Sequence, residues 1–328
     1  MSNPATLEAE LEQSARRIVT EVTGCVSCVV ERIPRGVMTH KFAVRPSHDE
    51  TYVVRFYPES RSHVVDYEPD LVRRCAEAGA KVPRVLADSR TGPPARLGYM
   101  VYAMIEGSTL SERFSTLSNL DLQRLCEDLM GSLSLIQQLK LTGWGELVNG
   151  WEASSSSWNE FIRNSFSEGL HTIRKHRLLT DALLHDIALV EGLMDELLIG
   201  APNHLICGDL GLGNIVLDDH NRLAGLIDFE GALVGDPLLT LGYCYARSGK
   251  DAFFESLKAG WEQRLGEVDW MRISFYAILR VLRVAKYAVG PLPTGHPREP
   301  LVTVFPALRL AVPNLVSNRD PQWSDAYE

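Results

Sequence analysis

The stretch of sequence that decides the fold is His204-Leu-Ile-Cys-Gly-Asp209-Leu-Gly-Leu-Gly-Asn214-Ile-Val-Leu-Asp-Asp-His-Asn-Arg-Leu-Ala-Gly-Leu-Ile-Asp228-Phe-Glu-Gly231. A short apolar strand leads into a glycine-rich loop that carries Asp209, and Asn214 follows at the start of a second strand, 215–217. Residues 218–222 have the composition of a turn, and a returning strand ends at Asp228. We predict a β-hairpin that brings Asp209, Asn214 and Asp228 to one edge.

The chemistry of these three side chains indicates a metal-dependent reaction. Two carboxylates and one amide oxygen are hard ligands of the kind that Mg²⁺ prefers. Phosphoryl transfer requires one carboxylate to orient the attacking hydroxyl and others to hold the metal that bridges the phosphates. The plain alternative is a surface loop followed by a turn or capping aspartate. The order and spacing of the two motifs favour the catalytic interpretation.

The segment resembles the catalytic core of the aminoglycoside phosphotransferase and choline-kinase-like family, which shares the protein-kinase fold. That family has a His-x-Asp-x-x-x-x-Asn loop and an Ile-Asp-Phe/Trp motif followed by Gly-Asp-Pro. The matching residues here are Asp209, Asn214, Ile227-Asp228-Phe229 and Gly235-Asp236-Pro237. The resemblance implies that Asp209 is the catalytic base and that Asn214 and Asp228 bind magnesium. It also implies that Asp236 steadies the catalytic loop.

The resemblance extends upstream and covers about residues 28–245. Arg55 occupies the place of the phosphate-binding lysine on the third strand, and Glu68 that of the glutamate that pairs with it. The residues expected to contact the nucleotide from the covering loop and from the hinge are Gly36, Thr39, Ala103, Met104 and Ile105. The implied cofactors are ATP and Mg²⁺. Within the family, the sequence is most similar to the hygromycin B phosphotransferases.

Three positions depart from the family pattern. Cys207 replaces the loop histidine, which should weaken support of the loop while retaining activity. Arg55 keeps the positive charge of the usual lysine but has a different reach. The alternative to a role in phosphate binding is that Arg55 forms a surface salt bridge with Glu68. Tyr102 lies where a bulky residue guards the base pocket, which keeps GTP as an alternative nucleotide.

The pattern of strands and helices predicts a two-lobed α+β fold of the protein-kinase type. Residues 1–106 should form the nucleotide-binding lobe, a small antiparallel sheet with one helix. Residues 107–328 should form the catalytic and substrate-binding lobe, mainly helical around the hairpin. Strands are predicted at 28–33, 41–44, 51–57, 82–86 and 98–105, and helices at 67–78, 122–139, 161–173, 181–198 and 270–289.

The composition is that of an ordinary globular protein, with 328 residues, 45% hydrophobic and 23% charged. The N-terminus lacks the pattern of a secretory signal, and no apolar stretch is long enough for a membrane span, so we expect a cytoplasmic protein with no membrane partner. Six scattered cysteines favour reduced thiols. Cys25-x-x-Cys28 is half a metal motif with nothing to complete it.

The charge distribution bears on the partners. The net charge is −9, and all of it lies beyond residue 110, because residues 1–110 carry 14 acidic and 14 basic side chains. This balance argues against a nucleic-acid partner. It favours a small, cationic acceptor with a hydroxyl group. An aminoglycoside is the preferred acceptor; the alternatives are a metabolic kinase for choline, an amino sugar or an amino alcohol, and a nucleotide-binding pseudokinase. The oligomeric state stays open.

Overall fold

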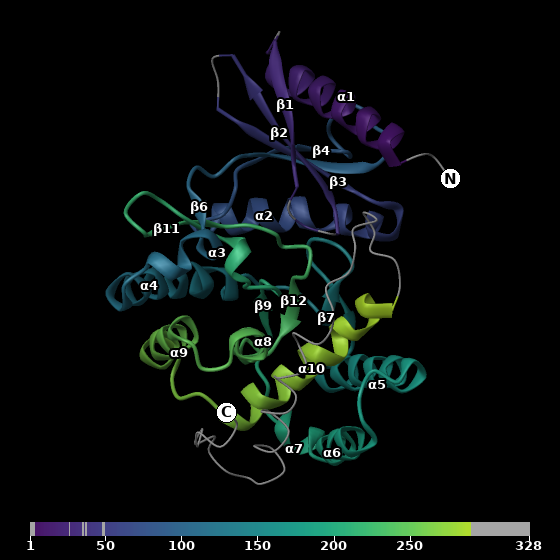
Figure 1. The fold of residues 1–328 in the computed structure, drawn as a ribbon, viewed down its shortest axis with the longest axis vertical. Coiled ribbons are helices and arrows are strands. Elements are labelled where there is room, and N and C mark those ends of the chain that lie inside the picture. The colour runs from purple at the N-terminus through teal and green to yellow at the C-terminus, as the bar shows by residue number, and fades with distance from the viewer. Residues whose placement is uncertain (1–3, 26, 35, 37, 48–49, 290–328) are drawn as a thin grey trace.

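The structure is a computed structural model and describes residues 4–289, apart from residues 26, 35, 37 and 48–49. The predicted loop at 34–40 and the predicted second lobe therefore lie partly outside the described residues. A five-stranded sheet with two helices forms one end of the molecule, and a larger, mainly helical part forms the other (Figure 1). This arrangement confirms the predicted α+β fold. The boundary between residues 106 and 107 stays a prediction.

The five-stranded sheet is antiparallel throughout, with strand order β1-β2-β3-β5-β4. Its strands are β1 (Cys28–Ile33), β2 (His40–Pro46), β3 (Tyr52–Tyr57), β4 (Val85–Asp88) and β5 (Gly98–Ala103). All five were predicted. The prediction of β4 was three residues too early, because Pro83 cannot donate a hydrogen bond to a neighbouring strand.

Both faces of the sheet are covered, so β3 is buried along its whole length. Val54 and Phe56 pack toward α1 (Pro4–Thr23), and the alternate residues Val53 and Tyr57 belong to the core that continues into the helical part. Arg55 shares the second face because side chains alternate along a strand. Helix α1 was not predicted, although its apolar residues recur at helical spacing, at Leu11, Ala15 and Ile18.

Helix α2 (Glu68–Glu77) places Glu68 against the sheet. It is preceded by the 3₁₀ helix η1 (Glu59–Asp66) and ends before Gly79, which has a φ of 87°. The backbone of Gly79 is in the left-handed region that commonly terminates a helix. The helix predicted at 67–78 is confirmed.

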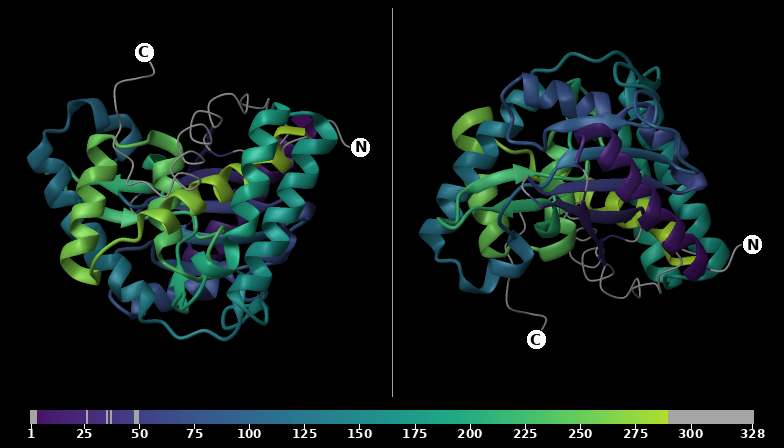
Figure 2. Two further views of the ribbon diagram at one scale, coloured as in Figure 1. Left: turned by 90° about the horizontal axis from the view of Figure 1, so that it is seen from below. Right: turned by 90° about the horizontal axis from the view of Figure 1, so that it is seen from above.

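The helical part surrounds the catalytic segment (Figures 1 and 2). Its helices are α3 (Leu110–Arg113), η2 (Phe114–Thr116), α4 (Asn119–Gln137), α5 (Trp158–His176), α6 (Asp181–Gly192), α7 (Met194–Leu197), η3 (Leu212–Asn214), α8 (Leu238–Ser248), α9 (Ala252–Leu265) and α10 (Trp270–Val289). The prediction of one helix at 181–198 was wrong, because the chain turns at Leu193 between α6 and α7. Helices α8 and α9 were not predicted.

The predicted hairpin is present as β10 (Ile215–Leu217) and β11 (Leu223–Leu226), which pair antiparallel. The hairpin forms a three-stranded sheet with β6, in the order β11-β10-β6, and a separate four-stranded sheet has the order β8-β7-β12-β9. The further strands are β6 (Ser108–Thr109), β7 (Trp144–Leu147), β8 (Ala153–Ser155), β9 (His204–Ile206) and β12 (Leu233–Gly235). A Cβ on Gly107 would lie 2.0 Å from the carbonyl oxygen of Leu217, so glycine lets β6 approach β10. Among the described helices, none is long and apolar enough to cross a membrane.

Candidate active site

Arg55 is the centre of a buried ion cluster between the sheet and the catalytic hairpin. Its side chain is only 2% exposed, and one guanidinium nitrogen lies 2.8 Å from Glu68. The other terminal nitrogen lies 2.8 Å from Asp228 and 2.7 Å from Glu230. Its Nε donates to the hydroxyl of Thr39 at 3.1 Å. The interpretation of Arg55 and Glu68 as a surface pair is therefore wrong.

Glu68 connects the sheet to the catalytic segment. The hydroxyl of Tyr57 donates to one carboxylate oxygen at 2.6 Å, and the amide of Phe229 donates to the other at 2.9 Å. Burial raises the pKa of Glu68, although the charge of Arg55 opposes that rise. Each carboxylate oxygen of Glu68 has a donor, which offsets the cost of burying it.

Asp228 lies at the end of the hairpin with a φ of 72°, a conformation that is uncommon outside glycine. Its second oxygen lies 3.5 Å from Nζ of Lys41. Burial alone would raise the pKa of Asp228, but the charges of Arg55 and Lys41 outweigh burial and hold that pKa well below its usual value. Asp228 is therefore ionised at neutral pH.

Lys41 and Glu230 also belong to this cluster and were not predicted from the sequence. Lys41 is directly paired with Arg55 across β2 and β3, so both side chains lie on the same face of the sheet. Both strands were predicted from the sequence, but their pairing and register were not. Glu230 lies two residues beyond Asp228, and its contact with Arg55 depends on the fold of the loop.

The catalytic loop and the metal motif are joined through Asn214. Its side-chain amide donates to the backbone carbonyl of Asp209 at 3.0 Å, and its backbone carbonyl accepts from the amide of Ile227 at 3.0 Å. Gly208 has a φ of 85°, and a Cβ there would lie 1.8 Å from the carbonyl oxygen of Gly231. The two motifs therefore touch backbone to backbone, as the predicted hairpin requires.

Two arginines hold the carboxylate of Asp209. Arg247 of α8 contacts one carboxylate oxygen, and Arg280 of α10 contacts the other at 3.1 Å. The side chain of Asp209 is 34% exposed, so it is open to solvent on one side. Neither arginine was predicted, because helical segments far apart in the sequence bring them to the loop.

The described residues fit a magnesium ion that is completed by a nucleotide. Asp228 offers an ionised carboxylate, and Asn214 turns its amide nitrogen toward the loop, which leaves the amide oxygen as the ligand atom. Mg²⁺ is usually held by one or two protein ligands together with phosphate oxygens and water. In the described part of the chain, no three His, Cys, Asp or Glu residues form a metal-binding group.

The other predicted nucleotide contacts lie around this cluster. Gly36 has a φ of 90°, and a Cβ on it would lie 2.9 Å from Nζ of Lys41, so the covering loop lies over that lysine. Thr39 is buried and bonded to Arg55. In the hinge, the amides of Ala103 and Met104 already donate to the carbonyls of residues 84 and 51.

The Ile105 side chain packs on the hairpin, since a Cβ on Gly225 would lie 2.4 Å from its Cδ1. Hydrogen bonds from the hinge to a base would therefore use polar groups other than the amides of Ala103 and Met104. Tyr102, the residue expected at the back of the base pocket, is buried.

Asp236 is tied to α10. Its carboxylate accepts from the hydroxyl of Tyr276 at 2.9 Å and lies 3.2 Å from Arg272. It also accepts from the amide of Leu238 at 3.0 Å, at the start of α8. The same Tyr276 hydroxyl accepts from the indole nitrogen of Trp158 at 2.9 Å. These bonds anchor the segment after the metal motif to α5, α8 and α10.

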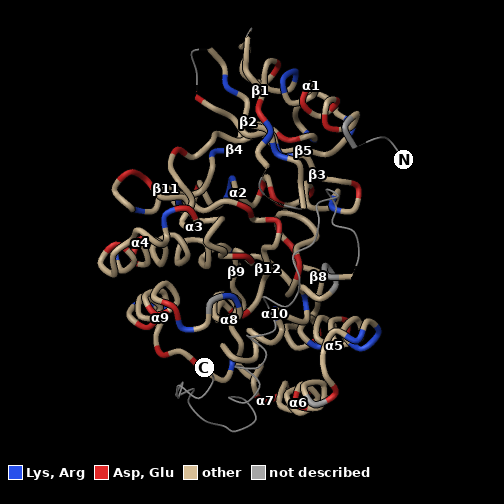
Figure 3. Tube along the Cα trace, in the orientation of Figure 1, with Lys and Arg blue, Asp and Glu red and all other residues tan. Residues whose placement is uncertain are grey.

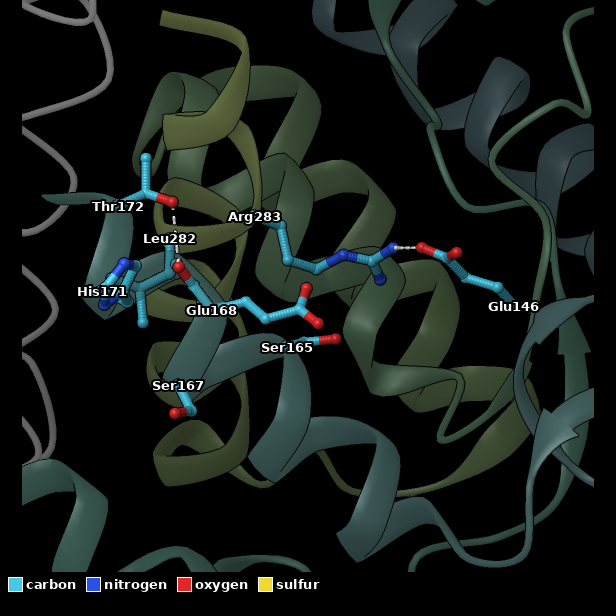
Figure 4. A pocket seen from close by; sticks show the side chains of 9 residues that line it. Glu146, Ser165, Ser167, Glu168, His171, Thr172, Leu282 and Arg283 are labelled. Carbon is cyan, nitrogen blue, oxygen red and sulfur yellow. Dashed lines mark hydrogen bonds and ion pairs between the residues drawn. The ribbon is translucent and has the colours of Figure 1, made fainter. Parts of the chain in front are cut away.

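A pocket of about 520 Å³ lies between α5 and α10 (Figure 4). Arg283 crosses its edge and pairs with Glu146 at 2.7 Å, and Glu168 lines the opposite side. Asp209, Asn214 and Asp228 do not line it. The pocket is therefore separate from the predicted chemical centre.

The fold and this ion cluster define a kinase-like phosphotransferase. Residues 29–276 match the sequence profile of the phosphotransferase enzyme family, APH, and the chain belongs to that family. Among curated proteins, none matches the chain by sequence. The predicted family is confirmed, and with it a phosphotransferase that acts on hydroxyl groups.

Solved structures have the same fold at low sequence identity. One is a thermostable mutant of aminoglycoside phosphotransferase APH(4)-Ia with AMP-PNP and hygromycin B (19% identity, 93% of this chain and 97% of that chain, TM-score 0.65). Another is the GDP complex of aminoglycoside 2'-phosphotransferase-IIIa (16%, 94% and 99%, TM-score 0.66). A third is a putative fructosamine-3-kinase from Haemophilus somnus 129PT (13%, 90% and 96%, TM-score 0.64).

Proposed function

We propose that the protein transfers the terminal phosphoryl group of a nucleoside triphosphate, ATP or alternatively GTP, to a hydroxyl of a small molecule. The observation that carries the proposal is that Asn214 binds the backbone of Asp209 through its side chain and that of Ile227, the residue before Asp228, through its carbonyl. Residues 1–106 act as the nucleotide-binding lobe and 107–328 as the catalytic and acceptor-binding lobe. The reaction takes place in the cytoplasm, where nucleoside triphosphates are abundant.

Asp209 is the catalytic base. It orients the acceptor hydroxyl and accepts its proton as the oxygen forms a bond to the γ-phosphorus. The bond to the bridging oxygen breaks, and its electron pair leaves with the nucleoside diphosphate. Asn214 and Asp228 would hold a magnesium ion, which supplies neutralising charge on the phosphates. Lys41 is positioned to contact a phosphate from β2, next to the covering loop.

The role of Arg55 differs from the one predicted from the sequence. Its guanidinium is enclosed by Glu68, Asp228 and Glu230 and is almost completely excluded from solvent. A buried cation with three carboxylates nearby has little capacity left for phosphate oxygens. We assign it to holding Asp228 in place, and we assign phosphate contact to Lys41, whose side chain is 13% exposed.

The acceptor class has two sources of support that disagree. The chain's acidity and the aminoglycoside-binding relatives favour a cationic aminoglycoside. The likeness to a putative fructosamine-3-kinase keeps a metabolic kinase as the second candidate.

The test is a coupled nucleoside-diphosphate release assay with a panel of hydroxyl acceptors, followed by mass detection of an added phosphate. The Asp209→Asn variant should lose turnover by several orders of magnitude while its nucleotide affinity stays within about threefold of wild type. A wild-type protein that binds nucleotide but phosphorylates no acceptor would favour the pseudokinase alternative.

A further inference from the structure

Two arginines contact Asp209, and the proposed reaction gives neither of them a role. Arg247 and Arg280 occupy one carboxylate oxygen each, so both oxygens of the proposed base are engaged. An acceptor hydroxyl that binds one of these oxygens either shares it with a guanidinium group or displaces that group. An acceptor that approaches Asp209 therefore meets two positive charges.

The two arginines are held to different degrees. The guanidinium of Arg280 lies 4.9 Å from the centre of the Tyr243 ring, and its side chain is 21% exposed. Arg247 lies near the C-terminal end of α8 with 36% of its side chain exposed. Arg280 is thus fixed by its stacking contact with Tyr243, and Arg247 is the residue that can exchange partners.

The catalytic loop leaves room for Arg247. A Cβ on Gly211 would lie 2.2 Å from a terminal nitrogen of Arg247 and 3.4 Å from the carboxylate of Asp209. The φ of Gly211 is −81°, which any residue adopts, so its missing side chain matters here for space. The guanidinium therefore occupies space beside Asp209 that a larger residue at 211 would take.

We propose that Arg247 and Arg280 form the acceptor subsite and that the acceptor carries an anionic group, a carboxylate or a phosphate, near the hydroxyl that is phosphorylated. This inference rests on the proposed phosphotransferase function. The anionic group replaces Asp209 as the partner of Arg247, because a guanidinium binds carboxylate and phosphate oxygens in the same geometry. The exchange frees one oxygen of Asp209 for the acceptor hydroxyl.

The proposal replaces the cationic acceptor predicted from the net charge. The acidity of the second lobe is spread over many residues, and basic residues are interspersed with acidic ones in both parts of the molecule (Figure 3). Charges more than about 8–10 Å apart are largely screened at physiological ionic strength. The two guanidinium groups in contact with Asp209 therefore outweigh the distant acidic residues in selecting the acceptor.

The test compares four acceptors with related six-carbon skeletons: gluconate, glucose 6-phosphate, glucose and glucosamine. Binding to the nucleotide-loaded protein is measured by isothermal titration calorimetry, and transfer by kcat and KM. We expect gluconate or glucose 6-phosphate to bind at least about tenfold more tightly than glucose and glucosamine. The ratio of the first two tells a carboxylate acceptor from a phosphate acceptor.

Arg247→Gln should remove this preference, with a rise in KM for the anionic acceptor and little change in KM for glucose. Arg264→Gln, at an exposed position on α9, removes the same charge and should leave the preference intact. Equal binding of all four compounds, tighter binding of glucosamine, or no binding of any would overturn the proposal. An equal loss with every acceptor in Arg247→Gln would also overturn it. Tight binding of the anionic compounds without transfer to any acceptor of the wider panel would count against the proposed phosphotransferase function and leave the anionic subsite standing.

Discussion

Lys41 and Arg55 are directly paired across β2 and β3 and both contact Asp228, yet their surroundings differ. Arg55 is enclosed by three carboxylates and a threonine hydroxyl. Lys41 lies 3.5 Å from Asp228 and is partly exposed beneath the covering loop. One strand pair thus presents a fully buried cation beside one whose side chain is 13% exposed.

Because Arg55 is fully buried and Lys41 is partly exposed, removing the two charges should affect different properties of the protein. Arg55→Met leaves Glu68 and Asp228 without their buried partner and should lower the free energy of unfolding by about 3–5 kcal/mol. Lys41→Met should leave that free energy within about 1 kcal/mol of wild type and raise the nucleotide KM about tenfold. Urea denaturation and nucleotide-saturation kinetics measure the two quantities. A stable Arg55→Met protein with weakened nucleotide binding would reverse the assignment.

Asp228 predicts a specific dependence of stability on pH. Its folded pKa lies well below the usual value of 3.8, so the unfolded chain binds a proton more readily than the folded one. The stability from ionised Asp228 is fully present above about pH 5 and is lost as the pH falls through 3.8 toward the folded pKa.

The comparison is between wild type and Asp228→Asn, by chemical denaturation from pH 7 to pH 3. We expect wild type to be more stable at pH 7 by on the order of 2 kcal/mol, and we expect the gap to narrow below about pH 4. A gap that stays constant over the whole range would show that the charge of Asp228 is not its source.

Two glycines of the catalytic loop provide a matched pair. Gly208 has a positive φ, and a Cβ on it would collide with the carbonyl oxygen of Gly231, whereas a Cβ on Gly213 would meet nothing closer than the hydroxyl of Ser111 at 4.0 Å. Gly208→Ala should lower the free energy of unfolding by at least about 2 kcal/mol and reduce kcat by more than tenfold. Gly213→Ala should change stability by less than about 1 kcal/mol. Equal effects of the two substitutions would contradict the close approach.

The sequence predicted most of what is local in this fold. The hairpin at 215–226 and the strand at 52–57 follow from apolar runs and turn residues, whereas Glu68 was identified through the resemblance to the family. The hairpin and the strand depend on neighbours in the chain, so a single sequence contains their signals.

The contacts between distant elements were not predictable in this way. Arg247 and Arg280 reach Asp209 from two helices, one of which, α8, was itself not predicted, and no spacing in the sequence links them. The burial of Arg55 was missed for a similar reason, since α1 closes one face of β3 and the catalytic segment closes the other. Net charge likewise does not show which charges lie next to Asp209, so the contacts of Arg247 and Arg280 could not be inferred from it.

Tyr276 provides the last prediction, because one hydroxyl joins three elements. It donates to Asp236 at 2.9 Å and accepts from Trp158 at 2.9 Å, and burial raises the pKa of Asp236 even with these bonds in place. Tyr276→Phe removes the oxygen and leaves a buried carboxylate and a buried indole N–H each short of a partner. The free energy of unfolding should fall by about 1–3 kcal/mol. The pKa of Asp236 should rise further, because a hydrogen bond that favours the ionised form is lost.

Chemical denaturation of wild type and Tyr276→Phe at pH 7 and pH 5 measures both effects. The loss of unfolding free energy should be smaller at pH 5, where more of the Asp236 carboxyl group is protonated. A loss that is larger at pH 5 than at pH 7 would mean that Tyr276 does not stabilise the ionised form of Asp236.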